Sequence, residues 1–284
     1  MRIRAPAKIN LSLRVVGKRR DGYHLLDTLM IPIGLYDEIE ITRPKRRHAA
    51  KGLTVTCDHS LVPSGKRNLA YRAAEVLLGK RAAREALHID IRKNIPVGAG
   101  LGGGSSDAAA VLLGLNRLFQ LKKTRRELLS LAAALGADVP FFIYGRPARA
   151  RGIGDEVHPR RTHRRFWVVI LYPGFPISTS WVYRNLSYTL TKGIENTSLN
   201  FSARSGKKLA RSLVNDLEKV VFRRYPKVAF LKKRLLQEGA AGALMSGSGS
   251  SVFGIFFTGD KARKAFLRLR KEDGTQAYLV RSLS

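Results

Sequence analysis

Alternation of apolar and polar residues predicts β-strands along much of the chain. In the strand predicted near residues 87–93, leucine and isoleucine occupy positions 87, 89 and 91 and polar residues lie between them, which is the period of a strand with one buried face. A first strand is predicted near residues 2–16, almost at the start of the chain. Further strands are predicted near residues 24–33, 36–43, 52–57, 148–151, 166–172, 242–245, 251–257 and 276–281.

Helices are predicted between these strands, near residues 67–79, 105–118, 124–136, 205–222, 226–238 and 260–271. One of them begins at Thr124, whose spacing to Glu127 forms a capping box. We expect Gly136 to end this helix in a left-handed conformation. The order of helices and strands is typical of a mixed α+β fold.

The length of the chain allows two domains. With 284 residues, of which 44% are hydrophobic, the chain can bury one large core or two ordinary ones, and it shows no repeats. The basic, proline-containing stretch from Val157 to Arg165 is the best candidate for a linker. We therefore expect one domain over residues 1–157 and a second over residues 158–284.

Cysteine usage and apolar runs indicate where the protein works. Cys57 is the only cysteine in the sequence, so no intramolecular disulfide can form and no oxidising compartment is implied. The longest apolar run, Trp167 to Tyr172, is far too short to span a bilayer. We expect a cytoplasmic protein that has no membrane partner and is a monomer or a weak homodimer.

Glycine is concentrated between Pro96 and Ala110, where the sequence reads PVGAGLGGGSSDAAA. Glycines leave room for backbone N–H groups to approach a phosphate, and the first turn of the following helix adds unpaired amides and about half a positive charge. A nucleotide is therefore the expected ligand. A flexible linker is the alternative, but a linker would not be flanked by a regular strand and a helix. The predicted nucleotide-binding residues are Pro96, Val97, Gly98, Ala99, Gly100, Leu101, Gly102, Gly103, Gly104, Ser105 and Ser106.

Two commoner glycine motifs do not fit this segment. A Walker loop needs a lysine before its Ser or Thr, whereas Ser105 follows Gly104 directly. A dinucleotide fingerprint needs an acidic residue about twenty positions further on. The residue found there is Thr124, among lysines and arginines.

The net charge is unusually high. The sequence has 52 lysines and arginines against 21 aspartates and glutamates, a formal net charge of +31, with clusters at 43–51, 146–165 and 261–271. Such a charge attracts anions and raises the possibility of nucleic-acid binding. The clusters lack interleaved aromatic residues, and no nucleic-acid-binding motif is present. We therefore interpret them as solvated faces and do not expect nucleic acid as a partner.

Four motifs in order along the chain resemble the GHMP small-molecule kinase superfamily. They are the glycine segment, PAKINLSLRVVGKRRDGYHLLDTLM from Pro6 to Met30, GADVPFF from Gly136 to Phe142, and MSGSGSSVFG from Met245 to Gly254. The resemblance implies a two-domain fold with a ribosomal S5 domain 2-like N-terminal domain and a ferredoxin-like C-terminal domain. It also implies an ATP-dependent kinase that uses Mg²⁺ and phosphorylates an alcohol.

Lys8 and Asp138 are the candidate catalytic pair. Phosphoryl transfer to an alcohol needs a group that accepts the hydroxyl proton. Asp138 precedes Val139-Pro140, where we expect the chain to extend. The local sequence alone favours a carboxylate that caps the next segment, whereas the resemblance implies that Asp138 is the general base. Lys8 shares one face of the first strand with Asn10 and Ser12, and is either exposed or paired with Asp138, which it would keep ionised. Asn10 would then hydrogen-bond the substrate or Asp138.

The sequence Asp21-Gly22-Tyr23-His24 resembles the superfamily members whose substrate carries a cytidine diphosphate group. Tyr23 and His24 follow a turn signal, so they emerge from a hairpin, and the resemblance implies that they bind the cytidine base. Tyr183 is the candidate for the opposite face of the base, with an ordinary core tyrosine as the alternative.

The remaining candidates depend on the resemblance. It implies that Ser246, Gly247, Ser248 and Gly249 support the glycine segment and the substrate phosphates, although a plain β-turn explains these glycines equally well. Asn68 resembles a residue near the adenine pocket and is alternatively a helix N-cap. Ser105 is the candidate Mg²⁺ ligand, and without an acidic cluster we expect phosphates to hold most of the ion.

Three functions remain open at this point. The first is a kinase that acts on an alcohol bearing cytidine diphosphate. The second is a GHMP kinase for another alcohol, of the homoserine or mevalonate type. The third is a basic nucleic-acid-binding protein without catalysis.

Overall fold

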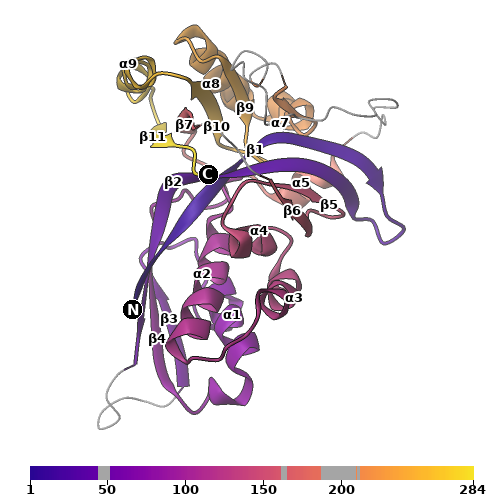
Figure 1. The fold of residues 1–284 in the computed structure, drawn as a ribbon. Coiled ribbons are helices and arrows are strands. Elements are labelled where there is room, and N and C mark those ends of the chain that lie inside the picture. Colours follow the sequence, from indigo (N-terminus) through magenta and orange to yellow (C-terminus); the bar gives the residue numbers. More distant parts are fainter. Residues whose placement is uncertain (44–51, 161–164, 187–208, 210–211) are drawn as a thin grey trace. The chain divides into compact units, whose positions relative to one another are not determined.

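The structure is a computed structural model that describes residues 1–43, 52–160, 165–186, 209 and 212–284. The chain forms two compact units, each assembled from separate segments (Figure 1). The first unit comprises residues 1–7, 35–97 and 102–145, and the second comprises residues 8–34, 98–101 and 146–284. Strands β1 (Arg2–Lys18) and β2 (His24–Thr42) contribute residues to both units. The predicted boundary between residues 157 and 158 stays a prediction.

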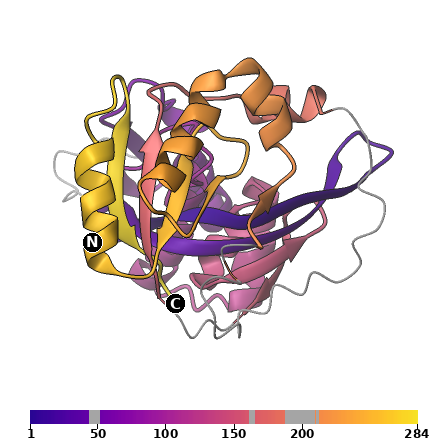
Figure 2. The same ribbon diagram turned by 90° about the horizontal axis from the view of Figure 1, so that it is seen from above.

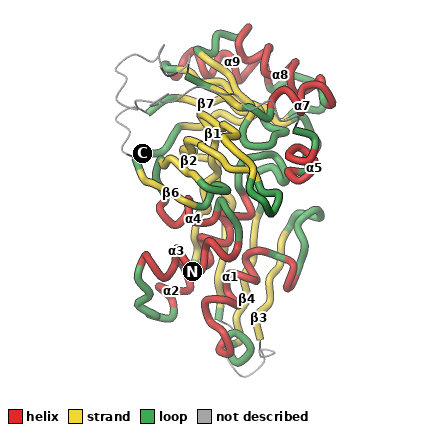
Figure 3. The backbone as a smooth tube through the Cα atoms, turned by 90° about the vertical axis from the view of Figure 1, so that its right-hand side faces the viewer, coloured by secondary structure: helices red, strands yellow, loops and turns green. Residues whose placement is uncertain are grey.

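The first unit packs helices beside a small sheet. Strand β3 (Gly52–Cys57) pairs in parallel with β4 (Ala86–Arg92), and β4 pairs antiparallel with residues 38–42 of β2. Helices α1 (Leu69–Leu78) and α2 (Gly103–Leu118) carry buried alanines, whose small side chains let the two helices approach closely. Figure 3 shows these red helices beside the yellow strands β3 and β4. The unit also contains α3 (Arg125–Leu135), α4 (Val139–Tyr144) and 3-10 helices at Gly65–Arg67 and Gly79–Arg81.

The second unit contains an antiparallel sheet in the order β11-β7-β10-β9. These strands span Gln276–Arg281, Trp167–Tyr172, Val252–Phe256 and Gly242–Met245, respectively. Helices α8 (Pro226–Gln237) and α9 (Gly259–Leu269) pack against the sheet, and appear orange and yellow in Figure 2. Their buried leucines and alanines join the apolar side chains of the sheet in one core.

A second group of strands in this unit lies beside residues 8–18 of β1. Strand β1 pairs in parallel with β8 (Val214–Asn215) at Ser12 and Leu13. Strand β2 pairs antiparallel with β5 (Ala148–Arg151), which pairs with β6 (Glu156–Pro159). The short helices α5 (Thr179–Arg184) and α7 (Glu218–Arg224) complete the described elements.

The sequence predicts most elements but misplaces several. Strand β2 is continuous where two strands were expected, and β6, α4 and α5 were not predicted. The predicted helix 205–222 lies partly outside the described residues, and its described part contains β8 and α7 instead. In the predicted linker 157–165, residues 157–159 belong to β6, and residues 161–164 lie outside the described part.

The turn around Asp138 also differs from expectation. Thr124 and Glu127 form the predicted capping box, but Gly136 ends α3 with an extended backbone, φ 169°, so the expected left-handed conformation is wrong. The chain does not extend at Val139-Pro140, because α4 begins at Val139. A proline is accepted in the first turn of a helix, where its missing N–H has no intrahelical partner to lose.

Candidate active site

The first part of the glycine segment, residues 98–101, belongs to the second unit. Gly98 and Gly100 have φ of +65° and +77°, the left-handed region that favours glycine. A Cβ atom on Gly100 would overlap the carbonyl oxygen of Ser246, so the position accepts no side chain. The Ser246 hydroxyl donates to the Gly100 carbonyl at 2.9 Å, and Ser251 N–H donates to the Ala99 carbonyl at 3.1 Å. The structure thus brings the Ser246–Gly249 turn against the glycine segment.

Lys8 lies beside this stretch in the same unit. Its backbone N–H donates to the Leu101 carbonyl at 2.9 Å, and its side chain is only 4% exposed, so the solvent-exposed alternative is wrong. Its Nζ donates to Oδ1 of Asn10 at 2.7 Å, and Asn10 Nδ2 donates to Thr28 Oγ1 at 2.7 Å. Thr28 in turn donates to the Ser12 carbonyl at 2.7 Å. These bonds fix the lysine against one face of β1, as the two-residue period predicts.

The glycine segment continues in the first unit, where it becomes helix α2. Gly102 is the N-cap with φ +75°, and α2 begins at Gly103, two residues earlier than predicted. The Ser106 N–H donates to the Gly102 carbonyl at 2.9 Å. The N–H groups of the preceding residues in this first turn are the unpaired amides that a helix offers to an anion.

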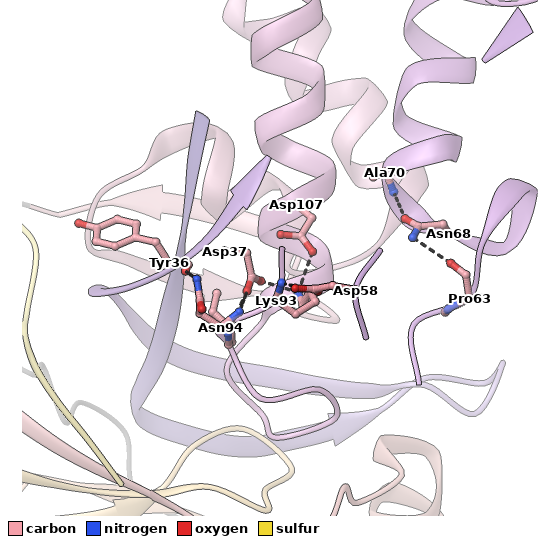
Figure 4. A network of polar contacts seen from close by, with 10 residues as sticks. Tyr36, Asp37, Asp58, Pro63, Asn68, Ala70, Lys93, Asn94 and Asp107 are labelled. Atoms are coloured by element: carbon pink, nitrogen blue, oxygen red, sulfur yellow. Dashed lines mark hydrogen bonds and ion pairs between the residues drawn. The ribbon is translucent and has the colours of Figure 1, made fainter. Parts of the chain in front are cut away.

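Beneath the start of α2 lies a buried ion cluster that the sequence reasoning missed (Figure 4). Lys93 Nζ pairs with Asp107 Oδ2 at 2.8 Å and also with Asp37 Oδ2. The other oxygen of Asp37 accepts from the N–H groups of Asn94 and Ile95 at 2.7 and 2.8 Å. A Cβ atom on Gly103 would lie 3.1 Å from Lys93 Nζ, so the first residue of α2 rests directly on the cluster.

Burial perturbs the charges of this cluster. Desolvation raises the pKa of Asp107 to about 7; the Lys93 charge works against this rise and the Asp37 charge adds to it. Burial alone would lower the pKa of Lys93, but the two carboxylates outweigh it and raise that pKa. One signal was visible in the sequence, because Asp107 is a charged residue directly before the apolar run 108–113 of the same helix.

Asp138 occupies the N-cap position of α4 and is half-buried. Its side chain makes no capping hydrogen bond, so capping of α4 does not account for the carboxylate. Asp138 belongs to the first unit and Lys8 to the second. The pairing of these two residues therefore stays a prediction.

Asn68 is the N-cap of α1, the structural alternative considered for it. Its Oδ1 accepts from Ala70 N–H at 2.8 Å, and its Nδ2 donates to the Pro63 carbonyl at 2.9 Å (Figure 4). Both ends of the amide thus serve local structure. A contact of Asn68 with adenine stays a prediction.

Tyr23 and His24 emerge from the predicted hairpin between β1 and β2. Gly22 has φ +89°, and the Tyr23 N–H donates to Asp21 Oδ1 at 3.2 Å in an Asx-type turn. Tyr23 is 61% exposed. Its neighbour His24 stacks on Tyr183 of α5, with ring centroids 5.2 Å apart and an interplanar angle of 27°.

This stack joins two residues that the sequence analysis selected independently. Tyr183 also packs against the apolar core of the second unit. Because the His24 and Tyr183 rings touch directly, a base does not fit between them in this arrangement, and base binding by Tyr183 stays a prediction. Burial, helped by the charge of Lys18, lowers the pKa of His24 below its usual 6.5, which favours the neutral ring.

No group of three or more His, Cys, Asp or Glu side chains among the described residues is arranged to hold a metal ion. Ser105 lies half-buried in the first turn of α2, beside the buried Ser106, whose hydroxyl has no hydrogen-bond partner in the described structure. These hydroxyls suit an ion that is held mainly by phosphates. In the described part of the chain, none of the helices combines the length and the apolar character needed to cross a membrane.

Comparison with known proteins agrees with the four motifs. The family model described as GHMP kinases N terminal domain matches residues 68–146, and the one described as GHMP kinases C terminal matches residues 198–274. A protein of Syntrophotalea carbinolica named 4-diphosphocytidyl-2-C-methyl-D-erythritol kinase is 45% identical, over 97% of this chain and 96% of its own. A protein of the same name from Citrifermentans bemidjiense is 46% identical, over 100% and 99%.

A solved structure extends the likeness to three dimensions. The crystal structure of a 4-(cytidine 5'-diphospho)-2C-methyl-D-erythritol kinase matches with a TM-score of 0.84 and 37% identity, and covers all of both chains. The chain therefore belongs to the GHMP kinase family, and the predicted two-domain α+β fold is confirmed. Within that family it groups, over its full length, with the relatives named 4-diphosphocytidyl-2-C-methyl-D-erythritol kinase.

Proposed function

We propose that the protein transfers the γ-phosphate of ATP to the 2-hydroxyl of 4-diphosphocytidyl-2-C-methyl-D-erythritol, in non-mevalonate isoprenoid precursor biosynthesis. The observation that carries the proposal is the glycine segment held by the Ser246–Gly249 turn beside Lys8. Full-length identity to kinases of that name supports the choice of substrate.

ATP binds through the glycine segment. The left-handed glycines at 98 and 100 have no side chains, so their backbone N–H groups are accessible to the phosphates. The first turn of α2 supplies further N–H groups. Mg²⁺ would be held by these phosphates with help from Ser105, and when bound it neutralises charge on the β- and γ-oxygens.

Lys8 and Asp138 act on the transferred group. The oxygen of the 2-hydroxyl attacks the γ-phosphorus, its proton moves to the Asp138 carboxylate, and the bond from the γ-phosphorus to the bridging oxygen breaks to release ADP. The Lys8 ammonium, oriented by Asn10, stabilises the negative charge that develops on the phosphoryl oxygens. Its pairing with Asp138 would keep that carboxylate ionised.

The cytidine end of the substrate is bound by Tyr23, His24 and Tyr183. The stacked His24 and Tyr183 rings offer an outer aromatic face, and the exposed Tyr23 adjoins it in the chain. A neutral His24 ring carries both a donor and an acceptor, as recognition of a cytosine edge requires. The reaction takes place in the cytoplasm, where its nucleotide substrates are found.

One panel of substrates tests this function. ADP release is measured with the cytidyl alcohol, homoserine, mevalonate and galactose, and only the first should support turnover. Stabilisation by CMP or CDP in thermal unfolding provides an independent test, because only a cytidine pocket predicts it. Turnover of homoserine or mevalonate would favour the second function considered above. RNA binding that survives about 0.3 M salt, without ADP release, would favour the third.

A further inference from the structure

The segment Asn215–Glu218, from the last residue of β8 to the first residue of α7, makes hydrogen bonds to the Ser246–Gly249 turn and to the strand before it. It belongs to the same compact unit as the turn, the first part of the glycine segment and Lys8. These residues lie within the helix predicted at 205–222, for which the sequence indicates no functional role. The polar side chains of the segment bond to backbone groups of β1, of β9 and of the turn that follows β9.

Asn215 makes the central contacts. Its Nδ2 donates to the carbonyls of Met245 and Gly247, both at 2.8 Å, and its Oδ1 accepts from Leu217 N–H at 3.0 Å. The residue is only 5% exposed, so water does not compete effectively for these groups. A side-chain amide has two N–H donors in one plane, and here both are used on the two sides of Ser246.

The neighbours of Asn215 secure the same region. Glu218 Oε1 accepts from Met245 N–H at 2.9 Å, while its Oε2 pairs with Lys232 at 2.6 Å. Asp216 Oδ2 accepts from Val15 N–H of β1 at 2.8 Å. The segment therefore connects the strand that carries Lys8 to the strand that leads into the turn.

The Ser246–Gly249 turn also determines the space around the reacting groups. Gly247 lies so close to the glycine segment that an added Cβ would be 3.1 Å from the Gly100 carbonyl oxygen. The same added atom would be 3.4 Å from Lys8 Nζ. A shift of the Gly247 carbonyl thus displaces backbone that borders both the phosphate-binding stretch and the catalytic lysine.

We propose that Asn215 is a positioning residue for phosphoryl transfer, which acts by fixing the Ser246–Gly249 turn against Gly100 and Lys8. The proposal rests on the kinase function proposed above. Both the N–H groups and the oxygen of the Asn215 amide are bonded within the chain, so the proposed role needs no contact with ATP or the alcohol. Its effect on turnover passes through backbone geometry, where a displacement of about 1 Å costs on the order of 100-fold in rate.

Two substitutions test the proposal through kinetics. In Asn215→Ala both donors are lost, and we expect kcat/KM for ATP to fall roughly 10- to 100-fold, with KM for ATP raised. In Asn215→Asp a carboxylate faces two carbonyl oxygens, so the loss should be larger at about pH 8. It should shrink toward lower pH, because burial raises the pKa of the introduced carboxyl group, and the proton that this group gains can be donated to one carbonyl.

Asn116 provides a matched control. It exchanges hydrogen bonds of the same kind with Lys123, through Nδ2 and Oδ1 at 3.1 Å each, far along α2 from its first turn. Asn116→Ala should lower thermal stability and leave both kinetic constants unchanged. If Asn215→Ala is recovered only unfolded, Asn215→Ser, which keeps one donor, must show the same kinetic change.

The outcomes separate this proposal from the proposed function. An unaltered protein that releases ADP, together with Asn215 variants that only melt earlier and keep KM and kcat, would overturn the positioning role. An unaltered protein without ADP release would overturn the kinase function. In that case calorimetric ATP binding still decides the role of Asn215, since a displaced glycine segment must weaken the binding of ATP.

Discussion

Gly100 and Ser246 touch through their backbones, although 146 positions separate them in the chain. The Ser246 hydroxyl donates to the Gly100 carbonyl at 2.9 Å, and the Ser246 carbonyl occupies the space that a side chain on Gly100 would need. Gly100 is also left-handed, with φ +77°. Two independent constraints therefore require glycine at this position of the glycine segment.

Gly100→Ala should raise KM for ATP and lower kcat/KM by about 100-fold, because the added methyl group must push the loop or the turn out of place. The measurement is steady-state ADP release at varied ATP. Gly239→Ala is the control, since Gly239 has φ +85° but no atom within 4 Å of an added Cβ. It should lose about 1–2 kcal/mol of stability from backbone strain without a change in KM. Equal kinetics for both variants would contradict the close contact.

Asp138→Asn should lower kcat by about two to four powers of ten, the usual scale for a positioned general base, and leave ATP affinity intact. The amide is nearly the same size as the carboxylate but cannot take up the hydroxyl proton. Single-turnover kinetics and calorimetric ATP binding measure the two effects separately. The exposed aspartate Asp260 in α9 offers a control in Asp260→Asn. Near-normal turnover by Asp138→Asn would remove Asp138 from its role.

The sequence correctly predicted those features of the fold and the candidate site that depend on residues close together in the chain. The two-residue period placed Lys8, Asn10 and Ser12 on one face of β1, and spacing alone identified the capping box of Thr124 and Glu127. Both depend only on neighbouring residues. The glycine segment was recognisable because five of the seven residues from 98 to 104 are glycine.

What the sequence could not predict depends on residues distant in the chain. Asn215 bonds to the carbonyls of Met245 and Gly247, and Lys93 pairs with Asp37 and Asp107, partners that no local pattern connects. Pro140 led to the wrong prediction of an extended chain after Asp138, because proline is excluded from the middle of a helix but is tolerated in its first turn. Short elements such as α4 carry too few residues for a period to show.

Asp107→Asn should change how stability depends on pH. Burial raises the pKa of Asp107 from 3.8 to about 7, so between these values the folded protein retains a proton that the unfolded chain releases. Stability must therefore fall as the pH rises through this window. The variant has no such proton. The unfolding temperature of the variant minus that of the unaltered protein should therefore increase as the pH is raised from about 5 to about 7.

The measurement is thermal unfolding over this range of pH. Glu75→Gln is the control, because Glu75 is exposed on α1 and the same exchange of charge for amide should give a difference that hardly varies with pH. A difference for Asp107→Asn that stays flat or falls with rising pH would show that Asp107 is ionised throughout, held in that state by Lys93.

The stack of His24 on Tyr183 gives a final prediction, on the cytidine end of the substrate. Tyr183→Ala removes the ring that supports His24, and the loss of aromatic stacking with a base costs about 1–3 kcal/mol, roughly a 5- to 150-fold rise in Kd for CDP. Tyr183→Phe keeps the ring and should bind CDP almost normally. CDP-dependent thermal shifts measure both, because stabilisation follows the ratio of ligand concentration to Kd. ATP-dependent shifts should be equal in the two variants, since the glycine segment is unchanged. If Tyr183→Ala retained the full CDP shift, Tyr183 would be an ordinary core residue and the base would bind elsewhere.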